Sequence, residues 1–284
     1  LAEFAFHLRR PAGEGGVVIK TMDGGMTWKR QAVLGDVDLR KVSCVDRDRC
    51  WIASSYLRTI LHTFDGGRSW NRQALSATGS PTSVYFIDKN RGWMTTVNGE
   101  ILRTVDGGAN WSRSLAAGAR YSFSDVHFPD PDNGWAVGKD GTMFRSGDGG
   151  LTWSNASPDV ARAFGDLAAG DVDFKAVRFF DSSTGWAAGL NGVIMATRDG
   201  GAHWFLQLNM YNSTNSIYGL VVIDAQTALA SGNMGHIYLP VDGGAGWYPV
   251  HGLVVNFLKR VVVALREKDH DAWLHSLQLI NSKQ

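Results

Sequence analysis

Short runs of alternating apolar and polar residues recur along this chain, and each run is followed by a polar turn and a Gly-Trp pair. Three such segments can be superposed residue by residue: Val84–Asp88 before Gly92-Trp93, Val126–Asp130 before Gly134-Trp135, and Val177–Asp181 before Gly185-Trp186. Alternation with a period of two predicts half-buried β-strands, and the polar turn predicts that two strands pair as a hairpin. We call these predicted strands A and B.

A tight turn and a third strand, C, are predicted after each Gly-Trp pair. The three segments carry Asn98-Gly99, Asp140-Gly141 and Asn191-Gly192 at this turn. Such pairs tolerate a positive φ at both positions and favour a type I′ hairpin. An Asp-Gly-Gly turn and a fourth strand, D, complete the unit, so each unit is predicted to be a four-stranded antiparallel sheet.

The Asp-Gly-Gly turn is the strongest periodic signal in the sequence. It begins six times, at intervals of 41 to 51 residues, and a Trp stands five residues after each Asp. A Ser or Thr stands two residues before each Asp except the last, where Pro240 takes its place. We expect each Asp to accept backbone N–H groups within its turn and each Trp to be buried between neighbouring sheets, both structural roles. The pairs are Asp23 and Trp28, Asp65 and Trp70, Asp106 and Trp111, Asp148 and Trp153, Asp199 and Trp204, and Asp242 and Trp247.

Repeated four-stranded units of about 40 residues are typical of the blades of a β-propeller. A ring protects the sheet edges that an open stack of such units would expose. The sequence therefore predicts an all-β fold in which residues 1–284 form a single β-propeller domain of antiparallel blades.

The ring is predicted to close by pairing of its N- and C-terminal strands. Residues 1–34 contain a C–D hairpin at Val17–Thr21 and Thr27–Gln31 but no clear strand A, whereas Lys259–Leu265 is typical of a strand A. Residues 252–284 would then supply the closing strands and tail, giving six blades. A seventh blade built from the tail is the alternative, and Trp273–Ile280 fits either a strand or a helix.

Strand direction divides the predicted propeller into two faces. The A–B and C–D turns lie on one face with every Asp-Gly-Gly turn, which we call the DGG face. The B–C and D–A connections lie on the opposite face, which we call the rim face. The long connections at Ser157–Asp173 and Asn209–Ser216 belong to the rim face, and loops on a rigid scaffold are where binding residues usually lie.

Basic residues also gather on the rim face, at or just before the starts of strands A. Ordinary solvated side chains would account for them, but a basic rim would also suit an acidic partner surface. We predict this rim to be a partner-binding site. Its residues are Arg40, Lys41, Arg120, Arg162, Lys175, Lys259 and Arg260.

The composition narrows the functional classes. The 284 residues are 44% hydrophobic and 19% charged with a net charge of +1, which does not suggest a nucleic-acid-coating protein. No apolar run approaches the roughly 18 residues of a membrane helix, so we expect no membrane insertion. The sequence opens at Leu1 rather than Met, as a chain without its signal peptide would, and an incomplete start is the alternative.

The two cysteines lie six residues apart across one predicted A–B hairpin. Cys44 replaces the strand-A Phe of the other units, and Cys50 replaces the Gly that precedes the strand-B Trp. We predict a disulfide and hence an exported, oxidising compartment, with a buried free Cys44 as the alternative. No clustered His or paired Cys predicts a metal site, and the Asp-Gly-Gly turns lack the alternating carboxylates of a calcium loop. We expect no metal and no cofactor.

The [Ser/Thr]-x-Asp-Gly-Gly-x-x-Trp units resemble Asp-box repeats of the bacterial neuraminidase type. The segment 181–189, with Asn191-Gly192 and Thr197–Gly201 after it, and the corresponding residues 130–150 resemble the photosystem II assembly and stability factor family. This resemblance implies a propeller in the thylakoid lumen or periplasm that holds folding intermediates of a membrane reaction centre through a basic patch. It implies a protein partner, namely a subunit or assembly intermediate of a membrane complex.

A glycoside hydrolase with Asp boxes is the alternative function. Sialidases need an arginine triad, and their N-terminal Arg-Ile-Pro is matched only loosely by Arg9-Arg10-Pro11. Other glycosidases need two carboxylates roughly 5–10 Å apart. Acidic residues on the rim face are Asp125, Asp159, Asp166, Asp171 and Asp173. Nothing in the sequence singles out a pair of them, so we predict a non-catalytic binding scaffold.

Overall fold

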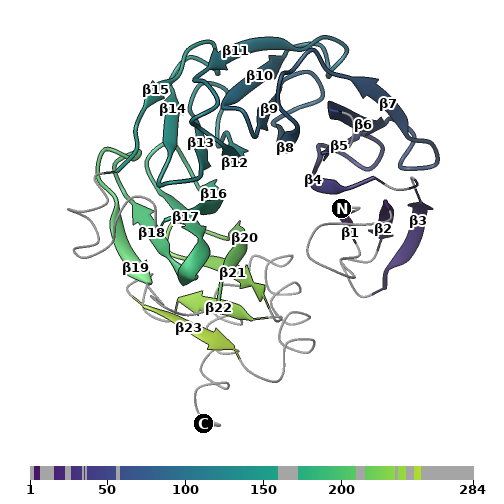
Figure 1. The fold of residues 1–284 in the computed structure, drawn as a ribbon. Coiled ribbons are helices and arrows are strands. Elements are labelled where there is room, and N and C mark those ends of the chain that lie inside the picture. The colour runs from purple at the N-terminus through teal and green to yellow at the C-terminus, as the bar shows by residue number, and fades with distance from the viewer. Residues whose placement is uncertain are drawn as a thin grey trace.

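The computed structural model describes residues 3–6, 16–22, 27–33, 35, 37–55, 58–158, 172–208, 215–233, 236–240 and 246–250. They form six antiparallel sheets, one of three strands and five of four. Figure 1 shows the sheets arranged as blades around a central space, with β4, β8, β12, β16 and β20 innermost. The fold is an all-β propeller, as the repeat predicts. Closure of the ring by Lys259–Leu265 depends on residues outside the described part and stays a prediction.

The strands follow the predicted order A, B, C, D within each complete blade. Blade 1 consists of β1 (Glu3–Phe6), β2 (Val17–Thr21) and β3 (Lys29–Val33), and blade 2 of β4 (Leu39–Cys44), β5 (Cys50–Ser54), β6 (Thr59–Thr63) and β7 (Asn71–Ala74). Blade 3 consists of β8 (Pro81–Phe86), β9 (Gly92–Thr96), β10 (Glu100–Thr104) and β11 (Ser112–Ala116). Blade 4 consists of β12 (Phe123–His127), β13 (Gly134–Gly138), β14 (Met143–Ser146) and β15 (Ser154–Asn155).

The last two blades have the same plan. Blade 5 consists of β16 (Phe174–Phe179), β17 (Gly185–Gly189), β18 (Ile194–Thr197) and β19 (Phe205–Leu208), and blade 6 of β20 (Ile217–Val222), β21 (Ala228–Gly232), β22 (Ile237–Pro240) and β23 (Trp247–Val250). In the described part of the chain we find no helix with the length and apolar character of a membrane span.

Blade 1 contains a strand that the sequence pattern did not predict. Strand β1 pairs antiparallel with β2 and contacts β4 of blade 2. Strands β5, β9, β13 and β17, the second strands of their blades, contact the first strand of the next blade in the same way. Strand β1 is therefore strand B of blade 1, and among the described residues this blade has no strand A.

Aromatic stacks hold consecutive blades together. The strand-B Trp of one blade lies parallel to the strand-A Phe of the next, with ring centroids 3.5 Å apart for Trp93 and Phe128 and 3.6 Å apart for Trp51 and Phe86. Each Phe ring fills the space over the Gly of its own hairpin, since a Cβ at Gly92 would lie 2.6 Å from Phe86. A Gly is therefore needed beside each of these stacks.

The Asp-Gly-Gly Trp side chains are less uniform than the sequence predicts. Trp204 and Trp247 are buried, Trp70, Trp111 and Trp153 are half-buried, and Trp28 is 42% exposed. Trp111 and Trp153 meet the stacked Phe of their own blade edge-on. The prediction of burial is wrong for Trp28, because its blade has no described strand A whose Phe would cover the indole.

The four described Asp-Gly-Gly turns are built alike. In the turn at Asp65, the Asp side chain accepts hydrogen bonds from the Thr63 hydroxyl at 2.8 Å and the Ser69 backbone N–H at 3.0 Å, and Thr63 in turn accepts from the Gly67 N–H. These hydrogen bonds lower the pKa of Asp65 well below its usual range. The turns at Asp106, Asp148 and Asp199 repeat the arrangement. The turn residues 23–26 and 241–245 lie outside the described residues.

The B–C turns follow the predicted type I′ geometry at two of three sites. Both residues have positive φ at Asp140-Gly141 and at Asn191-Gly192. At Asn98-Gly99 only Gly99 does. There the Thr96 hydroxyl accepts the N–H groups of Asn98 and Glu100, which holds Asn98 in a different conformation.

Candidate partner-binding site

The inner strands surround the centre of the ring (Figure 1), which we call the channel, and two of their positions differ from blade to blade. The first follows a β-bulge that all five described inner strands share, and it is occupied by Lys41, Ser83, Asp125, Ala176 and Gly219. The second lies two residues later and is occupied by Ser43, Tyr85, His127, Arg178 and Val221. The apolar residues between them, Val42, Val84, Val126, Val177 and Leu220, stay aliphatic. The aliphatic set is therefore kept by packing between blades, whereas the other two positions vary in chemistry, and among them Ala176 belongs to the core between blades 5 and 6.

One buried carboxylate joins four of these inner strands. Asp125 is fully buried and accepts from Arg178 at 2.7 Å, from Lys41 at 3.3 Å and from the Ser83 hydroxyl at 2.8 Å. The Val177 backbone N–H donates to it as well, at 3.2 Å. Two cations and one carboxylate leave a positive charge in the channel, held by a network that spans blades 2 to 5.

The electrostatics of the channel follow from burial and from these contacts. Burial raises the pKa of Asp125, but Arg178, Lys41 and the hydrogen bonds outweigh it and lower that pKa to about 2. Burial lowers the pKa of Lys41, and Asp125 opposes this effect. Burial and the neighbouring Arg178 lower the pKa of His127 to about 3, so its neutral ring accepts the Phe179 N–H through Nδ1 at 3.2 Å.

The predicted rim residues have different surroundings. Arg40 and Lys175 occupy equivalent bulge positions of β4 and β16, and each pairs with an acidic neighbour: Arg40 with Asp38 at 2.6 Å and Lys175 with Asp173 at 3.4 Å. Arg120 is exposed and lies over the Tyr121 ring. Lys41 turns toward Asp125 instead. Arg162, Lys259 and Arg260 lie outside the described residues.

In the described part of the rim face, acidic neighbours offset some of the predicted basic charge. Acidic residues that precede the inner strands offset Arg40 and Lys175, and Lys139 similarly lies 3.9 Å from Asp140. The pattern of charges along one strand does not reveal this pairing, because the acidic partners stand in the connections. Recognition at this face would depend on directed ion pairs rather than on a broad positive field.

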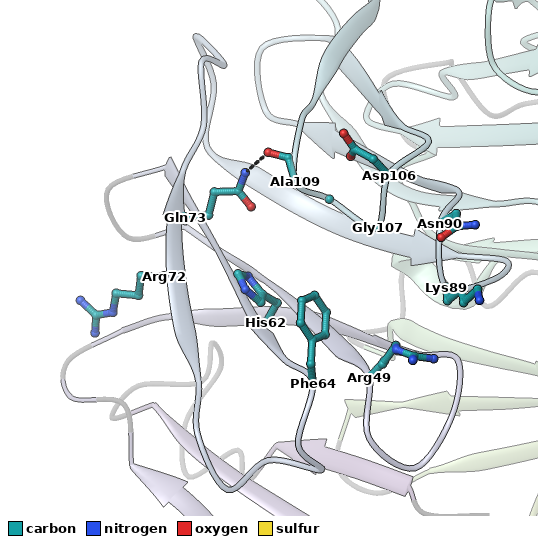
Figure 2. A pocket seen from close by; sticks show the side chains of 11 residues that line it. Arg49, His62, Phe64, Arg72, Gln73, Lys89, Asn90, Asp106, Gly107 and Ala109 are labelled. Carbon is teal, nitrogen blue, oxygen red and sulfur yellow. Dashed lines mark hydrogen bonds between the residues drawn. The ribbon is translucent and has the colours of Figure 1, made fainter.

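Grooves lie between blades on the described part of the DGG face, two of which we consider. The larger, of about 610 Å³, lies between blades 2 and 3, and the smaller, of about 350 Å³, between blades 1 and 2. Figure 2 shows His62 and Phe64 side by side in the larger groove, with Arg49 and Lys89 near one edge and Arg72 at the other. The Gln73 side chain crosses between the blades and donates to the Ala109 carbonyl at 3.0 Å. Sequence reasoning did not identify either groove.

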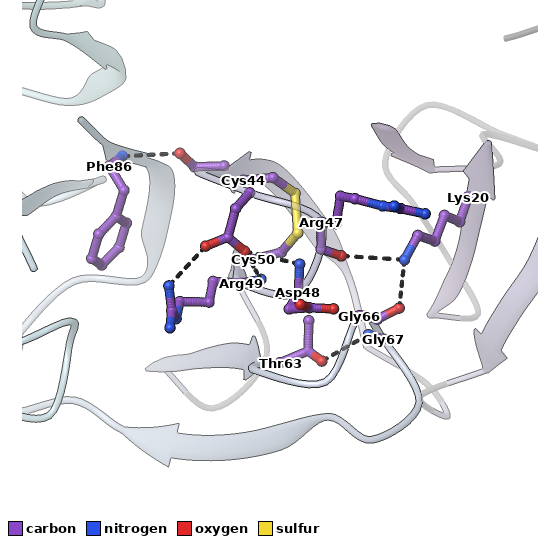
Figure 3. The surroundings of a disulfide bond; sticks show 12 residues. Lys20, Cys44, Arg47, Asp48, Arg49, Cys50, Thr63, Gly66, Gly67 and Phe86 are labelled. Atoms are coloured by element: carbon purple, nitrogen blue, oxygen red, sulfur yellow. Dashed lines mark hydrogen bonds and ion pairs between the residues drawn. A yellow bond between two sulfur atoms is a disulfide. The ribbon is translucent and has the colours of Figure 1, made fainter. Parts of the chain in front are cut away.

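The turn between β4 and β5 separates the two grooves, and a disulfide closes it. Cys44 and Cys50 are bonded and stand directly opposite each other, with Cα atoms 4.1 Å apart, so the predicted bridge is confirmed. Figure 3 shows the bridge beside this turn, from which Arg47 reaches the smaller groove and Arg49 the larger. Asp46 stabilises the turn by accepting hydrogen bonds from the backbone N–H groups of Asp48 and Arg49.

The described residues do not gather three or more His, Cys, Asp or Glu side chains into a site that would hold a metal ion. Of the acidic residues weighed for glycosidase chemistry, Asp125 is ion-paired in the channel and Asp173 pairs with Lys175. Asp159, Asp166 and Asp171 lie outside the described part of the chain. The charged side chains in the described part of the chain are suited to bind a partner through ion pairs and hydrogen bonds.

Comparisons with known proteins agree with this architecture. The family model of photosynthesis system II assembly factor YCF48 matches residues 12–123 and 113–260. No curated protein sequence matches the chain. Among solved structures, YCF48 from Cyanidioschyzon merolae is 20% identical, with 87% of this chain and 84% of that chain covered and a TM-score of 0.65.

Two further solved structures are similar to this chain, and their similarity supports only limited conclusions. A structure described as YCF48 bound to D1 peptide is 20% identical over 80% of this chain and 87% of that one, but its TM-score of 0.46 supports no conclusion about this chain. The GH74 xyloglucanase from Xanthomonas campestris is 15% identical with a TM-score of 0.58. The match covers 87% of this chain and only 44% of the xyloglucanase. At such identities the solved structures establish the fold alone.

Proposed function

This chain belongs to the photosynthesis system II assembly factor YCF48 family, and we propose that it is a non-catalytic scaffold that helps to assemble or stabilise a membrane or exported protein complex. The observation that carries the proposal is the family match, which extends over nearly all the blades. The partner would be a protein, namely a subunit of such a complex or an assembly intermediate. The Cys44–Cys50 disulfide supports an exported location, in a periplasm, a thylakoid lumen or outside the cell.

We place the partner surface of this scaffold on the rim face. Arg40, Arg120 and Lys175 lie there by strand polarity, together with the long connections that distinguish one blade from another. Arg162, Lys259 and Arg260 belong to the same proposed surface. The paired Asp38 and Asp173 would have to release their cations to an incoming carboxylate, which favours a partner with well-placed acidic side chains over any acidic surface.

Charge reversal tests this surface. The variant Arg40→Glu/Arg120→Glu/Lys175→Glu should lose capture of its partner from detergent-solubilised membranes, with the captured protein identified by mass spectrometry. Lys41 is left unchanged, because a carboxylate at that position would face the buried Asp125, and repulsion between the two would destabilise the fold. The control Lys29→Glu/Arg47→Glu/Arg68→Glu changes the net charge equally on exposed residues of the DGG face. Capture that survives the rim variant and not the control would refute the rim assignment.

Glycoside hydrolysis is the second candidate, because GH74 enzymes share the fold. It would need two carboxylates at glycosidase spacing, and Asp125 is held ionised by Lys41 and Arg178 rather than poised to donate a proton. Incubation with xyloglucan and with sialosides, followed by reducing-sugar analysis, separates the two functions. Hydrolysis abolished by Asp171→Asn or Asp173→Asn would replace the scaffold proposal.

A further inference from the structure

A long cation stands at one position of strand C in three of the six blades, close to the DGG face. The residue three positions before the turn Asp is Lys20, Arg103 or Arg145 in blades 1, 3 and 4. Lys20 donates to the Gly66 carbonyl of blade 2 at 2.8 Å, and Arg103 donates to the Gly149 carbonyl of blade 4 at 2.8 Å. Arg145 lies over the ring of Trp135 within its own blade. Lys20 and Arg103 therefore bridge neighbouring blades on this face, and Lys20 also lines the smaller groove.

Three blades depart from this pattern, and blades 5 and 6 carry Ala196 and Leu239 at this position. Blade 2 borders the larger groove. Its equivalent residue is His62, whose shorter side chain packs against Phe64 with ring centroids 4.8 Å apart. Among the described residues, the Gly107 carbonyl accepts from the Trp51 indole at 3.0 Å and no strand-C cation reaches it. The junction between blades 2 and 3 holds the larger groove, and His62 is one of its lining residues.

The groove combines an aromatic surface with positive charge. Phe64 is 53% exposed, and its ring makes an edge-to-face contact with the buried Trp51, with ring centroids 5.8 Å apart. Arg49, Arg72 and Lys89 line the groove, with Asp106 as the one carboxylate among its described lining residues. Arg49 also pairs with Asp46 at 2.8 Å. Asp106 is engaged by Thr104 and Asn110 of its own turn. Burial lowers the pKa of His62, so its ring is neutral at pH 7 and offers hydrogen bonds without charge.

We propose that this groove is a second binding site, for a short acidic peptide segment that also carries an apolar or aromatic side chain. Its carboxylates would pair with Lys89, Arg49 and Arg72, and its apolar side chain would pack on Phe64. The amides of Gln73 and Asn90 at the groove edge suit a peptide backbone. The choice of a peptide rests on the proposed scaffold function, whereas the site itself lies on the opposite face from the proposed rim surface.

Fluorescence anisotropy with a labelled hexapeptide of three Glu, one Phe and two Gly tests the site. The wild type should bind it at least about tenfold more tightly than the peptide with Gln in place of Glu, since charge pairing supplies the specificity. The variant Arg72→Glu/Lys89→Glu should weaken binding by at least about tenfold. The variant His62→Arg should also weaken it, because the arginine would reach the Gly107 carbonyl and fill the groove. That variant adds a cation, so a purely electrostatic surface would bind more tightly instead.

The reverse substitution provides a matched control. Arg103→His should open the junction between blades 3 and 4 and leave hexapeptide binding between blades 2 and 3 intact. The rim variant Arg40→Glu/Arg120→Glu/Lys175→Glu should bind the hexapeptide like the wild type even when partner capture is lost, so failure at one face is distinct from failure at the other. Equal binding by wild type and His62→Arg, or tight binding of trigalacturonate with no binding of the hexapeptide, would overturn the proposal.

Discussion

The junction between blades 2 and 3 and the junction between blades 3 and 4 share one framework and differ in what fills it. In each, a strand-B Trp stacks on the next strand-A Phe, and its indole donates at 3.0 Å to a carbonyl of the next Asp-Gly-Gly turn. At the later junction Arg103 donates to the same carbonyl, whereas at the earlier one His62 does not reach it. A repeat can therefore keep its aromatic stack while the residue beside the stack changes, and we expect that residue to contribute little to the stack.

Removing the shared stack should have the largest effect. Trp51→Ala and Trp93→Ala should each reduce the free energy of unfolding by about 3–5 kcal/mol, the usual range for a fully buried aromatic. Trp28→Ala should cost much less because its indole is 42% exposed. Urea unfolding followed by circular dichroism measures all three. A Trp51 variant far more stable than the Trp93 variant would show that the two junctions are not built alike.

Acid should distinguish junctions at their inner ends. The Phe86 N–H donates to the Ser43 hydroxyl between blades 2 and 3, whereas the Phe179 N–H donates to His127 between blades 4 and 5. Folding lowers the pKa of His127 from 6.5 to about 3, so the unfolded chain binds the extra proton and stability falls as the pH drops from about 6.5 toward 3. Between pH 7 and 4.5 the loss should be about 2–3 kcal/mol.

The variant His127→Asn isolates this contribution. It should reduce the pH dependence of urea unfolding between pH 7 and 4.5, part of which remains because burial also lowers the pKa of His62. Ser43→Ala should leave the slope unchanged. The carboxylates Asp125, Asp148 and Asp199 have pKa values of about 2, so the stability they contribute is lost below about pH 4, outside this window. An unchanged slope in His127→Asn would contradict the assignment.

Opening the disulfide should affect blade 2 more than the blades that lack one. The bridge closes a loop with a sequence separation of 6, and loss of so short a loop should cost about 2 kcal/mol. The double variant Cys44→Ala/Cys50→Ala should melt at a lower temperature than the wild type and should no longer respond to dithiothreitol. Hydrogen exchange should rise in the turn between β4 and β5 and stay unchanged in the turn between β8 and β9. Equal changes in both turns would argue against a local effect.

Exchanging the filling residues should have the smallest effect on stability. Arg103→His should lose about 1 kcal/mol, the net value of a hydrogen bond such as that from Arg103 to the Gly149 carbonyl, and His62→Arg should gain a similar or smaller amount. Urea unfolding of the two single variants and of the double exchange measures this. A loss of several kcal/mol in Arg103→His would mean that the filling residue supports the stack, and the comparison between the junctions would fail.

Local spacing determined most of the fold. The alternation, the Gly-Trp pairs and the six Asp-Gly-Gly turns are short-range patterns, and they located the strands of blades 2 to 5 and the faces on which the turns lie. Superposing the repeats also placed Cys44 opposite Cys50. The two cysteines take the places of the Phe and the Gly that lie next to each other in the hairpins of the other repeats. Strand β1 escaped prediction because Glu3–Phe6 has neither a Gly-Trp pair nor a turn signal beside it.

Only the tertiary structure decided which side chains meet across the ring. Lys41 and Asp125 are 84 residues apart and Arg178 lies 53 residues beyond Asp125, yet all three meet in the channel. No local pattern encodes this contact, because it arises from curvature that brings the inner strands of separate blades around a common axis. The groove was not predicted for the same reason. His62 is an ordinary strand residue in sequence, and the length of its side chain matters only because blade 3 lies beside it.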